Sequence, residues 1–349
     1  MENRSILLFR TMYLAIIILC IISLMYGPVK TSLYEIINII LYQFNLADVN
    51  SINQIKETVL IDIRLPRIFL AILIGAGLGT SGAILQGLFR NPLVDPGFIG
   101  ISSGAAVGAM IAIMFSKLIM QSFFEINPNF IIPIFAMSGS FFTTIIIYKM
   151  SKVFNKTNIM VMLLSGIAIN ALSGSIIGFL VTISSDIELR SFTFWSLGGL
   201  DAAEWQIVFI MLILIIIPYL FAHSLIKKLD IFMLGDSEAQ HLGINIEKLK
   251  RTIILISSIM VGISVAFCGM IGFVGLVTPH LIRLCIGPNH KYLIPGSALL
   301  GAIIILISDL ISKSIIAPAQ LPLGVVTSTI GAPFFIWLII NQKRRFYYS

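Results

Sequence analysis

Charged residues are scarce in this sequence: they make up 11% of its 349 residues, whereas hydrophobic residues make up 58%. An ordinary soluble domain carries roughly 25% charged residues, which keep its surface hydrated. The apolar residues recur from one end of the chain to the other and are not confined to one anchor segment. The composition therefore excludes a water-soluble globular domain and predicts a protein that crosses a membrane several times.

The sequence also lacks the short motifs of common enzyme classes. It contains no GxxxxGKS or GxxxxGKT phosphate loop, so the chain is not expected to hydrolyse ATP by itself. HExxH and GxSxG are absent, and Cys20, Cys268 and Cys285 lie in apolar stretches without CxxC spacing. We therefore predict no enzyme activity, no metal site and no cofactor.

The net charge of +7 does not indicate nucleic-acid binding. The basic residues stand singly or in short groups beside apolar runs, for example in residues 149–156 and 343–345, which is typical of membrane topology. With the amino terminus inside, most lysines and arginines fall in cytoplasmic segments. The positive-inside rule then predicts that both termini lie in the cytoplasm.

Apolar runs long enough to cross roughly 30 Å of hydrocarbon predict about ten transmembrane helices in one domain, residues 1–349. Helices are expected because lipid does not tolerate unpaired backbone groups. The predicted spans are residues 12–26, 68–89, 96–115, 130–148, 293–311 and 325–340 and runs beginning at 159, 205, 253 and 271. The run from 271 is short and contains Pro279, His280 and Arg283, so nine spans remain the alternative.

About ten spans divide into two equal sets, each with an odd number of helices, so the two sets would lie in opposite orientations. A weak internal echo supports such an inverted repeat. The glycines of residues 75–87 are followed by Asn91 and Pro92, and those of residues 262–275 by Thr278 and Pro279. Small residues in 75–82 and 102–108 also predict closely packed helices.

Acidic residues are nearly absent from the predicted spans, which argues against an ion-coupled carrier with a buried proton or sodium relay. The exception is Asp309, four residues before Lys313. At this helical spacing the two side chains can pair, so a structural ion pair is the simpler interpretation.

The longest predicted cytoplasmic segment, residues 223–250, has the composition of two short helices joined by a turn. Asp236 and Glu238 would lie in the first turn of a helix that begins after Gly235, and Gly243 would end that helix. Such a helix could receive a partner protein or could be a solvated connector.

Four blocks of sequence resemble the FecCD-type permeases of importers for iron siderophores, haem and cobalamin. The first comprises Arg-Leu-Pro-Arg at 64–67, the glycine-rich run 75–86, Asn-Pro-Leu-Val-Asp-Pro at 91–96 and residues 99–105. The others are residues 234–244, residues 272–295, and Gln-Leu-Pro-Leu-Gly at 320–324 with Gly-Ala-Pro at 331–333. The chain departs from the family pattern at Asn289, Lys291, Gln320 and Gly199.

The resemblance implies an all-α membrane protein with an inverted repeat, the fold of type II ABC importer permeases. It also implies several partners: a second permease subunit in a homodimer or heterodimer, two cytosolic ATP-binding subunits, an extracytoplasmic binding protein and membrane lipid. The chain would carry a ferric siderophore, or alternatively haem or cobalamin, across the cytoplasmic membrane.

The resemblance further implies roles for individual residues. Arg64, Arg67 and Lys313 match positions that receive acidic side chains of the binding protein, although anchoring to lipid headgroups is the alternative. The residues expected to couple the permease to the ATP-binding subunit are Gly235, Asp236, Ala239, Leu242 and Gly243. A membrane receptor that transports nothing is a further alternative, disfavoured by the match at residues 234–244.

Overall fold

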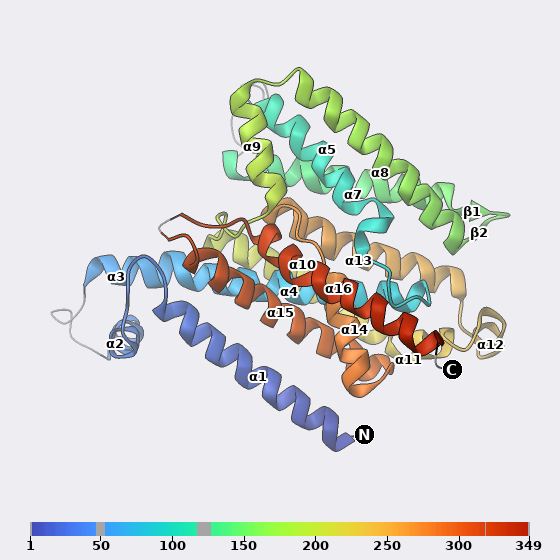
Figure 1. The fold of residues 1–349 in the computed structure, drawn as a ribbon, viewed down its shortest axis with the longest axis horizontal. Coiled ribbons are helices and arrows are strands. Elements are labelled where there is room, and N and C mark those ends of the chain that lie inside the picture. Colours follow the sequence, from blue (N-terminus) through green and yellow to red (C-terminus); the bar gives the residue numbers. More distant parts are fainter. Residues whose placement is uncertain (1, 47–52, 117–126, 318, 348–349) are drawn as a thin grey trace.

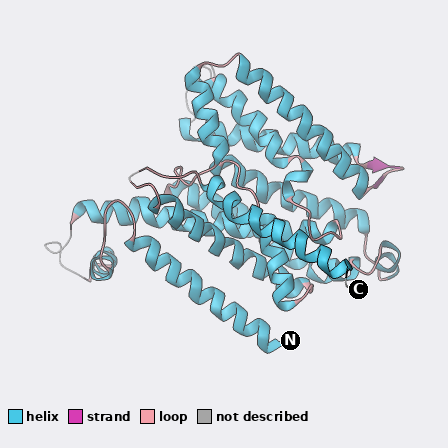
Figure 2. Ribbon diagram, viewed as in Figure 1, coloured by secondary structure: helices cyan, strands magenta, loops and turns pink. Residues whose placement is uncertain are grey.

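The computed structural model describes residues 2–46, 53–116, 127–317 and 319–347. This part of the chain is helical apart from loops and one β-hairpin, formed by β1 (Lys152–Val153) and β2 (Lys156–Thr157) (Figure 2). Among the described residues, seven helices are long and apolar enough to cross a membrane, and the second of them continues from the shorter segments before it. They are α1 (Glu2–Met25), α4 (Leu65–Leu88), α7 (Ile131–Met150), α8 (Ile159–Thr182), α10 (Trp205–Ser224), α13 (Ile246–Cys268) and α15 (His290–Ser314).

Three further helices of the described chain coincide with the remaining predicted spans through shorter apolar stretches: α5 (Ile101–Met114), α14 (Val274–Ile286) and α16 (Leu323–Tyr347), whose apolar part is Leu323–Trp337. The span predicted to start at 96 is divided. A 3₁₀ turn, η3 (Pro96–Ile99), is followed by Gly100 in the left-handed region with φ +72°, and only then does α5 begin. The doubtful span from 271 begins at Val274 as α14, with Pro279 inside it. The number of crossings stays a prediction.

Short helices lie at the two ends of the bundle. At one end are α2 (Leu33–Gln43), α3 (Gln54–Thr58), the π-helical η2 (Val59–Arg64), η4 (Pro128–Phe130) and α9 (Asp186–Leu197). At the other end are α11 (Ile226–Phe232) and α12 (Asp236–His241), on the same side as the β-hairpin, the start of α1 and the end of α16 (Figure 1). If that end faces the cytoplasm, as the basic residues predict, the first group faces outward.

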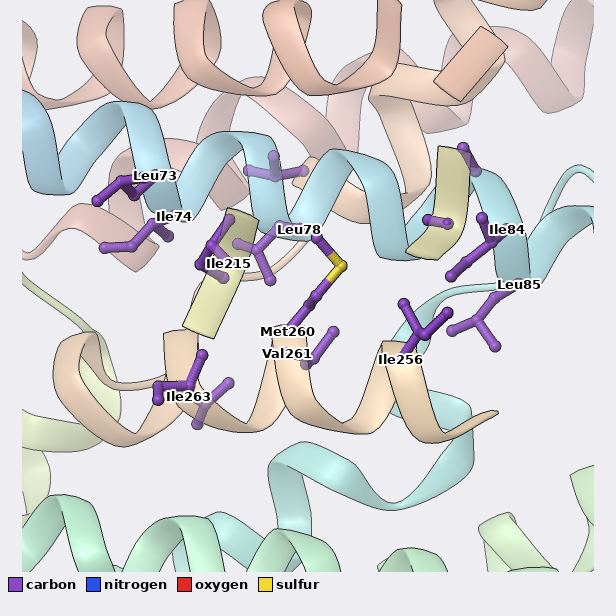
Figure 3. Close-up of a cluster of buried hydrophobic side chains, with 14 of the residues drawn as sticks. Leu73, Ile74, Leu78, Ile84, Leu85, Ile215, Ile256, Met260, Val261 and Ile263 are labelled. Atoms are coloured by element: carbon purple, nitrogen blue, oxygen red, sulfur yellow. The ribbon is translucent and has the colours of Figure 1, made fainter. Parts of the chain in front are cut away.

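The core of the bundle is built around α4 and α13. Leu78 of α4 and Met260 of α13 lie in a buried cluster with Ile215 of α10 between the two helices (Figure 3). In sequence, α4 belongs to the first half of the chain, yet it packs on α14 and α15 of the second half. Conversely, α13 packs on α5 and α7 of the first half. This reciprocal packing is the arrangement expected of an inverted repeat.

Glycines allow α4 to approach its neighbours at backbone distance. A Cβ atom on Gly82 would lie 1.8 Å from the carbonyl oxygen of Gly275, and one on Gly75 would lie 2.3 Å from that of Gly301. No side chain fits in these spaces, so the helices pack through bare backbone. The predicted role of the small residues in 75–82 is therefore confirmed.

Candidate functional site

A buried carboxylate organises the end of the bundle that is predicted to face outward. Asp309 of α15 is 1% exposed, and its two oxygens accept from different cations. The ammonium of Lys313 lies 3.0 Å from Oδ2, and Nε of Arg67 donates to Oδ1 over 2.7 Å. The pair between Asp309 and Lys313 confirms the prediction from helical spacing, and Arg67 joins it from α4.

Arg67 has two further partners, and both are closer to solvent. One guanidinium nitrogen lies 3.3 Å from Asp201, whose side chain is 79% exposed, and the other donates to the amide oxygen of Gln320 over 2.7 Å. These groups border a cavity of about 350 Å³ whose other walls include Trp195 and Phe267. Of the two carboxylates that pair with Arg67, Asp201 is therefore the one accessible to solvent.

Arg64 is also buried, with 5% of its surface exposed, and its contacts differ from those of Arg67. Its guanidinium donates to the backbone carbonyls of Leu24 and Val29 and, over 2.6 Å, to the hydroxyl of Thr31. No carboxylate pairs with it in the described part of the chain. Arg64 fixes the segment that follows α1 onto η2 and contributes an uncompensated positive charge.

The structure thus brings the three predicted docking residues to the same end of the bundle but turns their charges inward. Lys313 is 9% exposed and donates to the hydroxyl of Ser23 over 2.7 Å as well as to Asp309. Three cations against the two carboxylates Asp309 and Asp201 leave one net positive charge here. Docking of a binding protein at these residues stays a prediction.

The opposite end carries the segment predicted to couple to a partner. As predicted, α12 begins at Asp236 directly after Gly235, which has φ +137°, and ends before Gly243, which has φ +80°. The amide of Gly243 donates to the carbonyl of Gln240, and that of Ile244 donates to Ala239. These two hydrogen bonds are typical of a helix that ends at a glycine. They require a left-handed backbone conformation at that residue, which glycine adopts without strain.

Asp236 holds α12 against two transmembrane helices. Its Oδ1 accepts from Arg90, just beyond α4, over 2.5 Å, and its Oδ2 lies 3.5 Å from the ammonium of Lys250 in α13. Arg90 also donates to the carbonyl of Phe232 over 2.6 Å and lies 4.1 Å above the ring of that residue. Lys250 donates to the carbonyl of Thr157 over 3.0 Å. Sequence reasoning missed Arg90 and Lys250, although Arg90 directly precedes the Asn-Pro-Leu block.

The remaining predicted coupling residues divide into an inner and an outer set. Ala239, in the middle of α12, is fully buried, whereas Leu242, which follows the last residue of α12, is 61% exposed. A side chain of this size left in solvent on a fixed helix is a contact available to a partner protein. The segment itself is shorter than residues 223–250, because α10 continues to Ser224 and α13 begins at Ile246.

A contact between a carboxylate and an imidazole anchors α11. One oxygen of Asp230 lies 2.6 Å from Nδ1 of His290 at the start of α15 and also accepts from the backbone N–H of that residue over 3.0 Å. Burial opposes the charged carboxylate, but the hydrogen bonds from His290 outweigh burial and hold the pKa of Asp230 below its usual value. Both short helices are therefore tied by carboxylates to helices of the bundle.

Comparison with known proteins gives one consistent result. The model of the FecCD transport family matches residues 15–341. The hemin transport system permease protein HmuU of Yersinia pestis is 42% identical over 297 residues, which is 84% of this chain and 87% of that protein. The vitamin B12 import system permease protein BtuC of Salmonella typhi is 36% identical over 283 residues, 81% of this chain and 83% of that protein.

Solved structures agree with these sequence relatives. A metal-chelate type ABC transporter in an inward-facing conformation superposes with a TM-score of 0.82 at 31% identity, covering 96% of this chain and 99% of that one. PsaBC from Streptococcus pneumoniae in complex with Fab has a TM-score of 0.53 at 16% identity, covering 78% and 89%, which shows the fold alone. The helical bundle is thus that of type II ABC importer permeases.

Proposed function

The chain belongs to the FecCD transport family, and from this membership we propose that it is the membrane permease subunit of an ATP-driven importer that carries an iron chelate across the cytoplasmic membrane. The cargo proposed first is a ferric siderophore. The observation that carries the proposal is the geometry of α12. Asp236 fixes this short helix to α4 and α13, and Leu242 at its end is left exposed. A docking element that receives a displacement from an ATP-binding partner requires both features.

Haem is a second candidate cargo, because the hemin permease of Yersinia pestis is 42% identical to this chain. The vitamin B12 permease at 36% identity keeps cobalamin as a third. All three cargoes are large metal-bearing molecules, so the same bundle could pass any of them. Selection among them would then rest mainly with the binding protein that delivers the cargo.

The proposed transporter contains two ATP-binding subunits in the cytoplasm, this chain paired with a second permease subunit, and a binding protein outside, all assembled around the lipid bilayer. ATP binding and hydrolysis would shift the pair of permeases between two states by acting on α12. Such a shift requires only that the ATP-binding subunits hold α12 differently in the two states. Because Asp236 links α12 to α4 and α13, a displacement of α12 would be transmitted to the centre of each bundle.

Docking of the binding protein is proposed at Arg67, with Arg64 and Lys313 supplying the surrounding positive charge. Asp201, the exposed partner of Arg67, would be displaced by an incoming carboxylate. Asp201→Asn should then strengthen association with the binding protein several-fold, because one competing charge is removed. Unchanged association, measured with the purified binding protein and the permease in nanodiscs, would contradict this role for Arg67.

The proposed function is tested by uptake. Cells with and without this gene are given radio-iron as a panel of siderophores, radio-iron haem and labelled cobalamin. We expect gene-dependent accumulation of one iron chelate, abolished when the phosphate-loop lysine of the partner ATP-binding subunit is replaced. Loss of cobalamin uptake alone would keep the importer and replace the cargo, whereas accumulation that persists without the ATP-binding subunit would overturn the proposal.

A further inference from the structure

The tip of the β-hairpin carries an aromatic side chain in an unfavourable backbone conformation. Phe154 and Asn155 form a two-residue turn between paired strands, with φ +48° and +63°. Positive φ at both central residues defines a turn that normally contains Asn and Gly, and a bulky side chain there is strained. Phe154 is nevertheless 97% exposed, so its ring stabilises nothing within this chain. Strain held at an exposed site without an internal benefit points to a function elsewhere.

Hydrogen bonds and an ion pair connect the hairpin to the segment that contains α12. The backbone N–H and hydroxyl of Thr157 donate to one oxygen of Glu247 over 2.9 and 2.7 Å, and Lys250 donates to the carbonyl of Thr157. Since Lys250 also pairs with Asp236, a single polar network joins the hairpin to α12. Between them lies a cavity of about 600 Å³, whose lining includes Lys156 and Gln240.

The direction of the hairpin selects among possible partners. Figure 1 shows β1 and β2 projecting past the ends of α7 and α8, at the same end of the molecule as α12. An aromatic anchor for lipid would be expected at the level of the helix ends, where Tyr148 lies beneath the ammonium of Lys152, 5.1 Å from the ring centroid. Phe154 lies beyond that level, on the side where α12 is expected to meet its partner.

We infer that the β1–β2 hairpin is a second docking element for the ATP-binding subunit, with Phe154 as its apolar anchor and the adjacent cavity as the seat for a protruding segment of that subunit. This inference rests on the proposed function. Aromatic side chains, including Phe, are enriched at protein interfaces, where a few buried anchors carry most of the binding energy. The ATP-binding subunit would then contact two segments of the permease, α12 and the hairpin, that are distant in sequence.

The test uses the permease in nanodiscs and its purified ATP-binding subunit. Phe154→Asn removes the ring but supplies a residue that favours the left-handed conformation, so the turn is retained. We expect its dissociation constant for the ATP-binding subunit to rise about tenfold or more, while Phe154→Tyr stays within about twofold. Phe44→Asn is the matched control, because Phe44 is 71% exposed at the opposite end and should leave binding unchanged.

Photo-crosslinking separates the two possible occupants. With p-benzoylphenylalanine at position 154, we expect an adduct with the mass of the ATP-binding subunit. An adduct with lipid alone, or wild-type affinity in Phe154→Asn, would overturn the hairpin inference. If the wild-type permease itself fails to bind the ATP-binding subunit, the proposed function fails instead, so the two failures are distinguishable.

Discussion

Replacing Asp309 tests the arrangement of charge in the cluster that Asp309 forms with Arg67 and Lys313. Asp309→Asn keeps the shape of the side chain but removes the negative charge that Arg67 and Lys313 share. One amide oxygen can still accept a hydrogen bond, whereas the amide NH₂ would face a cation. Two buried cations, 11% and 9% exposed, would then lack their common partner.

The expected loss of folding free energy follows from the burial of Asp309 and of the two cations. Breaking a buried ion pair by removing one partner costs about 3–5 kcal/mol, because the remaining charge stays desolvated. The second carboxylate on Arg67 provides an internal comparison. Asp201 is 79% exposed, so Asp201→Asn should cost no more than about 1 kcal/mol. The same guanidinium is therefore predicted to give two losses that differ several-fold.

Thermal unfolding of the detergent-solubilised permease, followed by tryptophan fluorescence, measures both losses. Asp309→Asn should lower the midpoint by several degrees and Asp201→Asn by little. The double variant Asp309→Asn with Lys313→Met should recover part of the loss, since it removes one unpaired cation. Equal midpoints for the two single variants would refute the assignment of Asp309 as the buried centre of this cluster.

Three further outcomes are expected. Gly82→Ala should prevent stable folding, because its Cβ would lie 1.8 Å from a carbonyl oxygen, whereas Gly174→Ala, with no atom within 4 Å of its Cβ, should leave the unfolding midpoint unchanged or slightly raised. Asp236→Ala should lower uptake and loosen α12, detectable as faster hydrogen exchange there, while Leu242→Ala should lower ATP-driven uptake with the exchange of α12 unchanged. Asp230→Asn should lower the free energy of unfolding of the permease at neutral pH. Because the pKa of the Asp230 carboxyl is depressed in the folded state, this loss of stability relative to wild type should be complete above the unfolded pKa of about 4. It should disappear as the pH falls through the folded pKa.

Features that depend on nearby residues were predictable from the sequence. The limits of α12 followed from Gly235 and Gly243, and the pairing of Asp309 with Lys313 followed from their spacing along one helix. Two helices outside the predicted spans had readable signals that were overlooked. Ser32 with Glu35 and Ser185 with Glu188 form capping boxes at the starts of α2 and α9.

Contacts between distant segments could not be predicted in this way. Arg67 and Asp309 are separated by 242 positions, and Arg90 and Asp236 by 146, so nothing in one sequence pairs them. The burial of Arg64 is a second example. A basic residue near the end of an apolar run is expected to face water, but here the last turn of α1 and the segment that follows it supply backbone acceptors. Its charge was predictable, whereas its surroundings were not.

The two ends of the bundle share one arrangement of charged side chains. At each end a carboxylate from the second half of the chain joins a cation of that half to an arginine at an end of α4: Asp309 with Arg67, and Asp236 with Arg90. Between these points α4 is locked to α15 through Gly75 and Gly301. A helix fixed at both ends and along its length cannot absorb a displacement by bending. We therefore expect movement of α12 to carry α4 and α15 together, so that a change at the proposed ATP-binding subunit would reach the cluster around Asp309 as a rigid-body shift.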